Sequence, residues 1–182
     1  CTVQVSLMKA YEWLNANTPN DSVVMTPSFI TNVEIPIHTH NRIFLARAYQ
    51  SLASDKEVIN RLLITYKLFG VPAAYLYEML ETYDGVFNLV TLKYFSRELD
   101  AFYKGGAKYG GYTIPIAEKK KILNEYTFFN LPEKLPYRLD YIFVGPRERE
   151  MGIPEDAFHG MKKLYEADGI IIYKWVDVRK AG

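Results

Sequence analysis

Apolar residues recur along the chain at two different spacings, and these spacings predict alternating helices and strands. In the helical stretches every third or fourth position is apolar, whereas the strands are short apolar runs bounded by turn residues. We expect helices over residues 5–17, 28–35, 55–69, 73–83, 87–102, 115–126 and 154–166, and strands over residues 22–26, 42–45, 140–144 and 169–175. Strand, short helix and strand follow one another between residues 22 and 45, which is typical of a parallel β-α-β unit.

Turn chemistry adds detail at two points. Ser54 and Glu57 form a capping box at the start of a helix, and Gly70 closes the same helix. Asp168-Gly169 is a hairpin-type turn, so the strand that follows it favours an antiparallel or edge position. The fold class predicted from the whole pattern is α/β, a Rossmann-like three-layer sandwich with a mostly parallel sheet.

The length of the chain favours one domain. With 182 residues, 49% hydrophobic and 24% charged, residues 1–182 suffice for one well-cored globular unit and are short for two. Within it, residues 71–112 are predicted to be a largely helical insertion rich in aromatic side chains. Because 22 Lys and Arg balance 21 Asp and Glu, the chain lacks the basic field that nucleic-acid binding requires.

Cys1 is the single cysteine, so neither an internal disulfide nor a thiolate metal cluster is expected. The sequence opens at Cys1 without an initiator Met or a signal-peptide pattern. Two interpretations remain open: the boundary of an excised fragment, or the lipid-bearing terminus of a bacterial lipoprotein. No apolar run approaches the roughly 20 residues that span a bilayer.

Three segments carry a family resemblance: residues 11–24, 140–149 and 164–173. In composition, order and spacing they resemble the extracytoplasmic domains that follow the last transmembrane helix of bacterial and archaeal polytopic membrane proteins. Many of those proteins are glycosyltransferase-like, of the GT-C type. The resemblance covers about residues 5–66 and 116–176, and the insertion departs from it.

The resemblance implies a membrane-tethered domain on the extracytoplasmic face, with the transmembrane portion of the same polypeptide as its partner. A glycan or a lipid-linked saccharide is a further partner that it suggests. In such proteins the catalytic carboxylates lie in the transmembrane portion. No catalytic residue is therefore carried over to this chain.

The carboxyl edge of the predicted sheet offers the first candidate site. Arg147 and Arg149 directly follow the strand over residues 140–144, and Ser28 follows the first strand. Open α/β sheets bind ligands at this edge, and arginine there can grip a phosphate or carboxylate. If the chain is a small α/β enzyme, we expect a pocket at this edge lined by Ser28, Arg42 and Arg147, and Arg149 is a further candidate for ligand binding. The interpretation that we favour is a self-neutralising turn in which the charges of residues 147–150 pair with one another.

Two histidines form a weak candidate for a metal site. His38 and His40 would point to the same side of an extended segment, but zinc needs a third protein ligand, for which His159 is the candidate. An exposed polar loop explains the pair equally well. The sequence contains neither a G-x-G-x-x-G fingerprint nor a G-x-S-x-G elbow, so we expect no nucleotide cofactor and no hydrolase nucleophile.

A glycine-rich loop over residues 104–112 is the remaining candidate. Tyr103, Tyr109 and Tyr112 lie in or beside it, and a loop seldom buries three aromatic rings. Such rings suit saccharide stacking or a partner surface. The leading hypothesis is a non-catalytic accessory or recognition domain of a membrane-embedded glycosyltransferase-like protein. The alternatives are an independent saccharide- or protein-binding module, lipid-anchored or free, and a small α/β enzyme that uses the Arg147 edge.

Overall fold

The computed structural model of the protein describes residues 2–46, 53–81 and 116–176. In these ranges lie six helices, α1 (Thr2–Asn17), α2 (Phe29–His38), α3 (Asp55–Phe69), α4 (Ala73–Glu81), α7 (Ile116–Phe128) and α8 (Pro146–Glu150). They also hold five strands, β1 (Val23–Met25), β2 (Arg42–Ile43), β3 (Tyr141–Val144), β4 (Lys163–Ala167) and β5 (Ile170–Lys174). None of these helices is both long enough and apolar enough to cross a bilayer.

The five strands form one mixed sheet in the order β2-β1-β3-β5-β4. Strand β1 is parallel to β2 and to β3, which confirms the expected β-α-β unit, whereas β5 is antiparallel to both β3 and β4. The prediction of a Rossmann-like sandwich with a mostly parallel sheet is therefore wrong. The second half of the sheet contains a hairpin of β4 and β5. Asp168 and Gly169 both adopt positive φ angles, 50° and 76°, and so reverse the chain between the two strands in two residues.

The predicted helix over residues 154–166 is also wrong. Turns cover residues 155–160, and residues 163–167 form β4, whose register pairs Ala167 with Ile170 and Glu166 with Ile171. Helical spacing of Phe158, Met161 and Tyr165 suggested the helix, but pairing across the Asp168-Gly169 turn is the stronger constraint. The short helix after β3 is instead α8, which begins at Pro146.

The other predicted helices in the described ranges agree with the structure to within a few residues. The Ser54 hydroxyl accepts the Glu57 amide, and Gly70 ends α3 in the left-handed conformation with φ 68°. Helix α2 runs three residues beyond its predicted end. The predicted helix over 87–102 and the glycine-rich loop with Tyr103, Tyr109 and Tyr112 lie outside the described residues.

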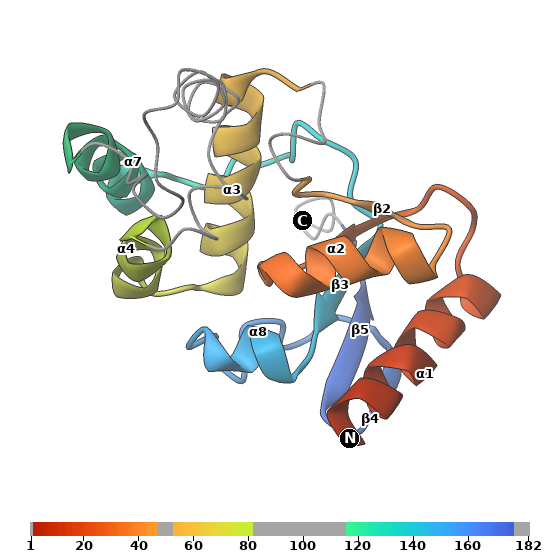
Figure 1. Cartoon of the computed structure of the whole chain (residues 1–182). Coiled ribbons are helices and arrows are strands. Elements are labelled where there is room, and N and C mark those ends of the chain that lie inside the picture. Colours follow the sequence, from red (N-terminus) through yellow and green to blue (C-terminus); the bar gives the residue numbers. More distant parts are fainter. Residues whose placement is uncertain (1, 47–52, 82–115, 177–182) are drawn as a thin grey trace, which may run out of the picture.

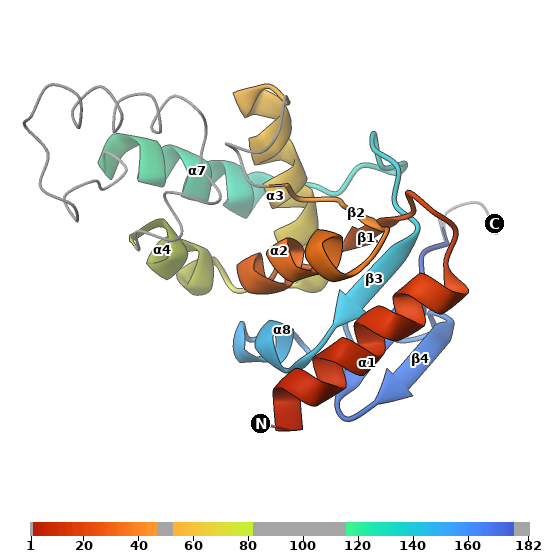
Figure 2. The same cartoon turned by 45° about the vertical axis from the view of Figure 1, so that its right-hand side comes forward.

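Helices cover both faces of the sheet (Figures 1 and 2). Strand residues alternate between the faces: Val24, Tyr141 and Phe143 pack with α1 and α2, whereas Met25 and Ile142 pack with α3. Helices α4 and α7 pack on the side of α3 away from the sheet (Figure 1). The face toward α1 and α2 is the one that presents the candidate site.

Candidate functional site

The carboxyl ends of β1 and β3 meet at a point where the strand order reverses. The chain leaves β1 through α2 toward β2 on one side, while β3 lies on the other side of β1. Ligands of open α/β sheets bind at such switch points. Here the β1-α2 loop and the β3-α8 loop face each other across it.

A buried carboxylate joins these two loops. Glu148 is completely buried, and its Oε1 accepts hydrogen bonds from the hydroxyls of Thr26, at 2.7 Å, and Thr31, at 2.8 Å. Its Oε2 accepts the backbone N–H of Gly145 at 2.7 Å. Since a buried charge is costly without strong donors, these three bonds make the burial possible. Glu148 thereby fixes the start of α2 against the start of α8.

The loop around this carboxylate is held by further internal bonds. Thr26 Oγ1 also accepts the backbone N–H of Ser28, and Ser28 Oγ accepts that of Thr31, which makes Ser28 the N-cap of α2. The side-chain amide of Asn32 donates to the Thr26 carbonyl at 2.8 Å, while its buried Oδ1 has no partner among the described residues. Ser28 is therefore occupied with helix capping.

Arg147 is occupied by an acidic residue of α2. Its guanidinium forms two hydrogen bonds to Glu34, at 2.6 and 3.1 Å, in a bidentate ion pair. The Tyr11 hydroxyl of α1 donates to the same carboxylate at 2.9 Å. The arginine, the carboxylate and the phenol thus tie α8, α2 and α1 together beside the switch point.

The pKa values of Glu34, Arg147 and Tyr11 are all shifted from their ordinary values. Burial alone would raise the pKa of Glu34, but hydrogen bonds from Arg147 and Tyr11, with the charge of Arg147, bring it below its ordinary value. The pKa of Arg147 is raised, mainly by its hydrogen bonds to Glu34. Burial and then the Glu34 hydrogen bond raise the pKa of Tyr11. Each shift favours the paired state, in which Glu34 and Arg147 are charged and Tyr11 is neutral.

The remaining predicted arginines do not join this site. Arg42 is in register with Val23 at the amino end of the strands, the opposite edge from Ser28 and Arg147, and it pairs with Asp21 at 2.8 Å. Arg149 is exposed and donates to the Gly169 carbonyl of the β4-β5 turn. The expected pocket lined by Ser28, Arg42 and Arg147 together is therefore not formed.

The two histidines of the predicted metal pair make separate contacts. The His38 ring stacks on Tyr11 with 5.6 Å between ring centroids, whereas His40 Nε2 lies 2.9 Å from the Thr18 carbonyl oxygen. In the part of the chain that the structure describes, no group of three or more His, Cys, Asp or Glu side chains is placed to hold a metal ion.

Sequence reasoning missed the residues that organise this edge: Tyr11, Thr26, Thr31, Glu34 and Glu148. The predicted self-neutralising turn pairs the charges of residues 147–150 with one another, whereas the partners of Arg147 and Glu148 lie on α2 and in the loop before it. A signal did exist. Glu148 follows Gly145 by three residues, the spacing at which an N3 glutamate reaches back to the N-cap amide of a helix.

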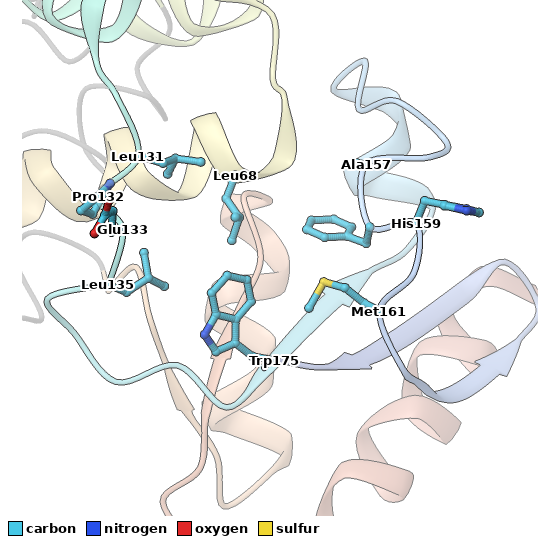
Figure 3. A pocket seen from close by; sticks show the side chains of 10 residues that line it. Leu68, Leu131, Pro132, Glu133, Leu135, Ala157, His159, Met161 and Trp175 are labelled. Carbon is cyan, nitrogen blue, oxygen red and sulfur yellow. The ribbon is translucent and has the colours of Figure 1, made fainter. Parts of the chain in front are cut away.

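A hollow lies on the other face of the sheet, the face that α3 covers. It has a volume of about 210 Å³ and is lined by apolar side chains, namely Leu68, Leu131, Leu135, Phe158, Met161 and Trp175. Glu133 and His159 border it and are exposed, and the His159 ring points away from Trp175 (Figure 3). The lining lacks the converging polar groups that orient a sugar or a nucleotide. Its chemistry suits an apolar group.

The polar edge and the apolar hollow therefore differ in what they can do. At the switch point the carboxylates, hydroxyls and guanidinium bond to one another, so the arrangement holds loops in place and offers no nucleophile paired with a base. The hollow can receive an apolar group but has no group inside it for acid-base chemistry. Comparisons with known protein families, with curated proteins and with solved structures find no match to this chain.

Replacing Glu148 by Gln tests the role of the buried carboxylate. Both carboxylate oxygens of Glu148 accept hydrogen bonds, whereas the Gln amide has one acceptor oxygen and an NH2 group. The NH2 group would face a hydrogen-bond donor, so at least one buried group would be left unpaired. We expect a loss of about 2–3 kcal/mol in the free energy of unfolding, measured by urea denaturation. Glu150→Gln, at an exposed position of the same helix, should stay within about 0.5 kcal/mol of the parent. Equal effects of the two substitutions would contradict the assigned role.

The Glu34–Arg147 pair makes stability depend on pH in the acid range. Because the pKa of Glu34 is lowered by folding, the pair stabilises the protein above the ordinary carboxyl pKa of 4.5 and loses this contribution as pH falls through the folded-state pKa. Glu34→Gln should cost about 1 kcal/mol at pH 7, a modest value because the pair is partly exposed. The difference from the parent should shrink in urea titrations at pH 3. Exposed Glu12→Gln is the control, and an undiminished difference at pH 3 would refute the assignment.

Proposed function

We propose that this chain is a non-catalytic accessory or recognition domain of a membrane-embedded, glycosyltransferase-like protein, held on the extracytoplasmic face of the membrane. The observation that carries the proposal is the internal pairing at the switch point. Arg147 is engaged by Glu34, Glu148 by Thr26 and Thr31, and Ser28 by the helix that it caps. The small-enzyme alternative needs these groups free for a substrate.

The way the resembling segments come together supports the same proposal. Tyr11, from the first segment, stacks on Phe143, from the second, with 6.0 Å between ring centroids. Asp140 accepts the Val23 backbone N–H at 2.8 Å, and Asp168, from the third segment, accepts the Ser6 hydroxyl at 3.0 Å. These residues brace one layer of the fold. A likeness built on them points to a shared scaffold, with the chemistry of the whole protein located elsewhere.

The test uses the full-length gene product in its own cells, detected with an antibody against this chain. We expect a polypeptide far larger than 21.1 kDa that stays with the membranes in alkaline carbonate and is cut by protease added to intact spheroplasts. A band near 21 kDa would contradict the proposal and support a free or lipid-anchored module. Release by carbonate, or protection from the protease, would also contradict it.

A second measurement addresses catalysis directly. Membranes carrying Arg147→Lys should transfer sugar from polyprenyl-phosphate donors at a rate within about twofold of the parent, because lysine can still pair with Glu34. If Arg147 stabilised a reacting phosphate, losing its bidentate contact would lower the rate by about 100-fold or more. That larger loss would favour the small-enzyme alternative.

The apolar hollow supports a second candidate, a binding module for an apolar group. Trp175 lines the hollow, and Trp13 is the other tryptophan of the chain, so Trp13→Phe makes the intrinsic fluorescence report on Trp175. We expect benzyl alcohol to change that fluorescence saturably and methyl glucoside to leave it unchanged, since cavities of about 150 Å³ already admit benzene. Adding Met161→Lys should abolish the change. Equal responses to both compounds would rule out a selective apolar site.

A further inference from the structure

Contacts within the chain hold one wall of the apolar hollow in place. Phe158 is buried, and its ring packs against Phe69, with 4.8 Å between ring centroids, and against Tyr173, with 5.5 Å. The backbone N–H of Trp175 donates to the Asp140 carbonyl at 3.0 Å, which ties the end of β5 to the residue before β3. This wall is therefore a fixed part of the fold, as the walls of ligand sites usually are.

The loop between α7 and β3 supplies the opposite wall and is held by α3. Leu131 and Leu135 of this loop line the hollow. Two residues of α3 hold the neighbouring Tyr137: the Arg61 guanidinium lies 3.9 Å from its ring centroid, and Asn60 donates to its hydroxyl at 3.4 Å. The leucines of the loop are thereby kept at a fixed distance from the end of β5.

Trp175 presents the largest aromatic surface of the hollow. Its side chain is half-buried, and Leu68, Leu135 and Met161 surround it (Figure 3). Among the residues that the structure describes, no aromatic ring or cation stacks on the Trp175 indole. Phe158, by contrast, is paired with two other rings. The hollow thus contains an indole that a ligand can stack on.

The lining favours an aromatic ligand over an aliphatic one. An aromatic ring stacked on indole gains more than the burial of its area alone provides, because the two quadrupoles attract in an offset arrangement. The Met161 thioether adds a second contact that favours aromatic rings. A saturated ring of the same size gains the burial but neither of these contacts.

The lining also favours an uncharged ligand of one ring. The side chains inside the hollow are hydrocarbon, thioether and indole, and a charge buried among them without a partner would be costly. Cages that bind cations surround them with several aromatic faces, whereas leucines form much of this wall. With a volume of about 210 Å³ the hollow has room for one ring and a short substituent, since about 150 Å³ already admits benzene.

We propose that the hollow binds a small uncharged molecule with a single aromatic ring, which stacks on the Trp175 indole. This inference rests on the second candidate function, the binding of an apolar group, and it specifies the class of ligand. A hydroxyl or similar polar substituent on the ring points to the border of the hollow, where Glu133 and His159 are exposed.

The test compares benzyl alcohol with cyclohexylmethanol, which has the same number of carbon and oxygen atoms but a saturated ring. Ligand-observed NMR titrations of the chain give the Kd of each compound. Burial of apolar surface alone makes the saturated compound bind at least as tightly. Because stacking on the indole reverses that order, we expect the Kd of benzyl alcohol to be lower by about threefold or more.

Two variants assign the preference to the indole. Trp175→Leu keeps the lining apolar, so it should still bind cyclohexylmethanol but should bind benzyl alcohol no more tightly than that compound. The matched control is Tyr77→Leu, because Tyr77 is 48% exposed on α4 and lies outside the lining of the hollow. The control should keep the preference of the parent.

A second measurement leaves Trp175 in place. In the Trp13→Phe chain the resonances of the single remaining indole come from Trp175. Benzyl alcohol should shift its ring protons upfield through the ring current, and cyclohexylmethanol should shift them at least fivefold less.

The remaining outcomes overturn the inference, and they separate it from the function on which it rests. Equal or tighter binding of cyclohexylmethanol, or a preference that persists in Trp175→Leu, refutes the aromatic ligand and leaves the apolar-binding candidate standing. Tighter binding of tetramethylammonium than of benzyl alcohol would assign the hollow to cations and refute both. Binding of none of these compounds also refutes both.

Discussion

The arrangement at the switch point depends on one buried carboxylate that is satisfied by two hydroxyls and a backbone amide. Glu148 holds the β1-α2 loop against the β3-α8 loop, and so it fixes where α2 begins. From that starting point α2 directs Glu34 toward Arg147 and leaves Ile30 and Ile37 exposed. A neutral side chain of the same size would leave donors unpaired in the interior. The placement of α2 beside α8 therefore depends on a single buried carboxylate.

A charged turn at the end of a parallel strand can stabilise the fold and need not form a ligand site. Arginines at the carboxyl edge of a parallel pair suggest a phosphate or carboxylate site. Here Arg147 and Glu148 are both used to hold layers of the fold together, one by an ion pair across helices and the other by hydrogen bonds beneath them. The residues are where a ligand site is expected, but their partners come from the chain itself. The candidate chemistry is therefore scaffolding, and the hollow on the other face of the sheet is lined mainly by apolar side chains.

Much of the helical framework could be predicted because its signals are local. The cap at Ser54, the left-handed Gly70 and the β1-α2-β2 order all follow from short stretches of sequence. Strand β4 could not be recognised alone, since its identity comes from pairing with β5 across Asp168-Gly169. The same reason explains the site: Glu34 and Arg147 lie 113 positions apart, and only the sheet order brings them together. The spacing of apolar residues predicts which face of a helix is buried, but it does not predict which distant charged residue pairs with that helix.

The two edge strands of the sheet, β2 and β4, avoid pairing with other chains in different ways. Strand β2 is only two residues long, too short to template a neighbour. Strand β4 is longer but carries Lys163 and Glu166, which are exposed and paired with each other. Charges on an outer strand discourage growth of the sheet into an aggregate. With both edge strands protected in this way, pairing of the sheet with strands of other molecules is suppressed.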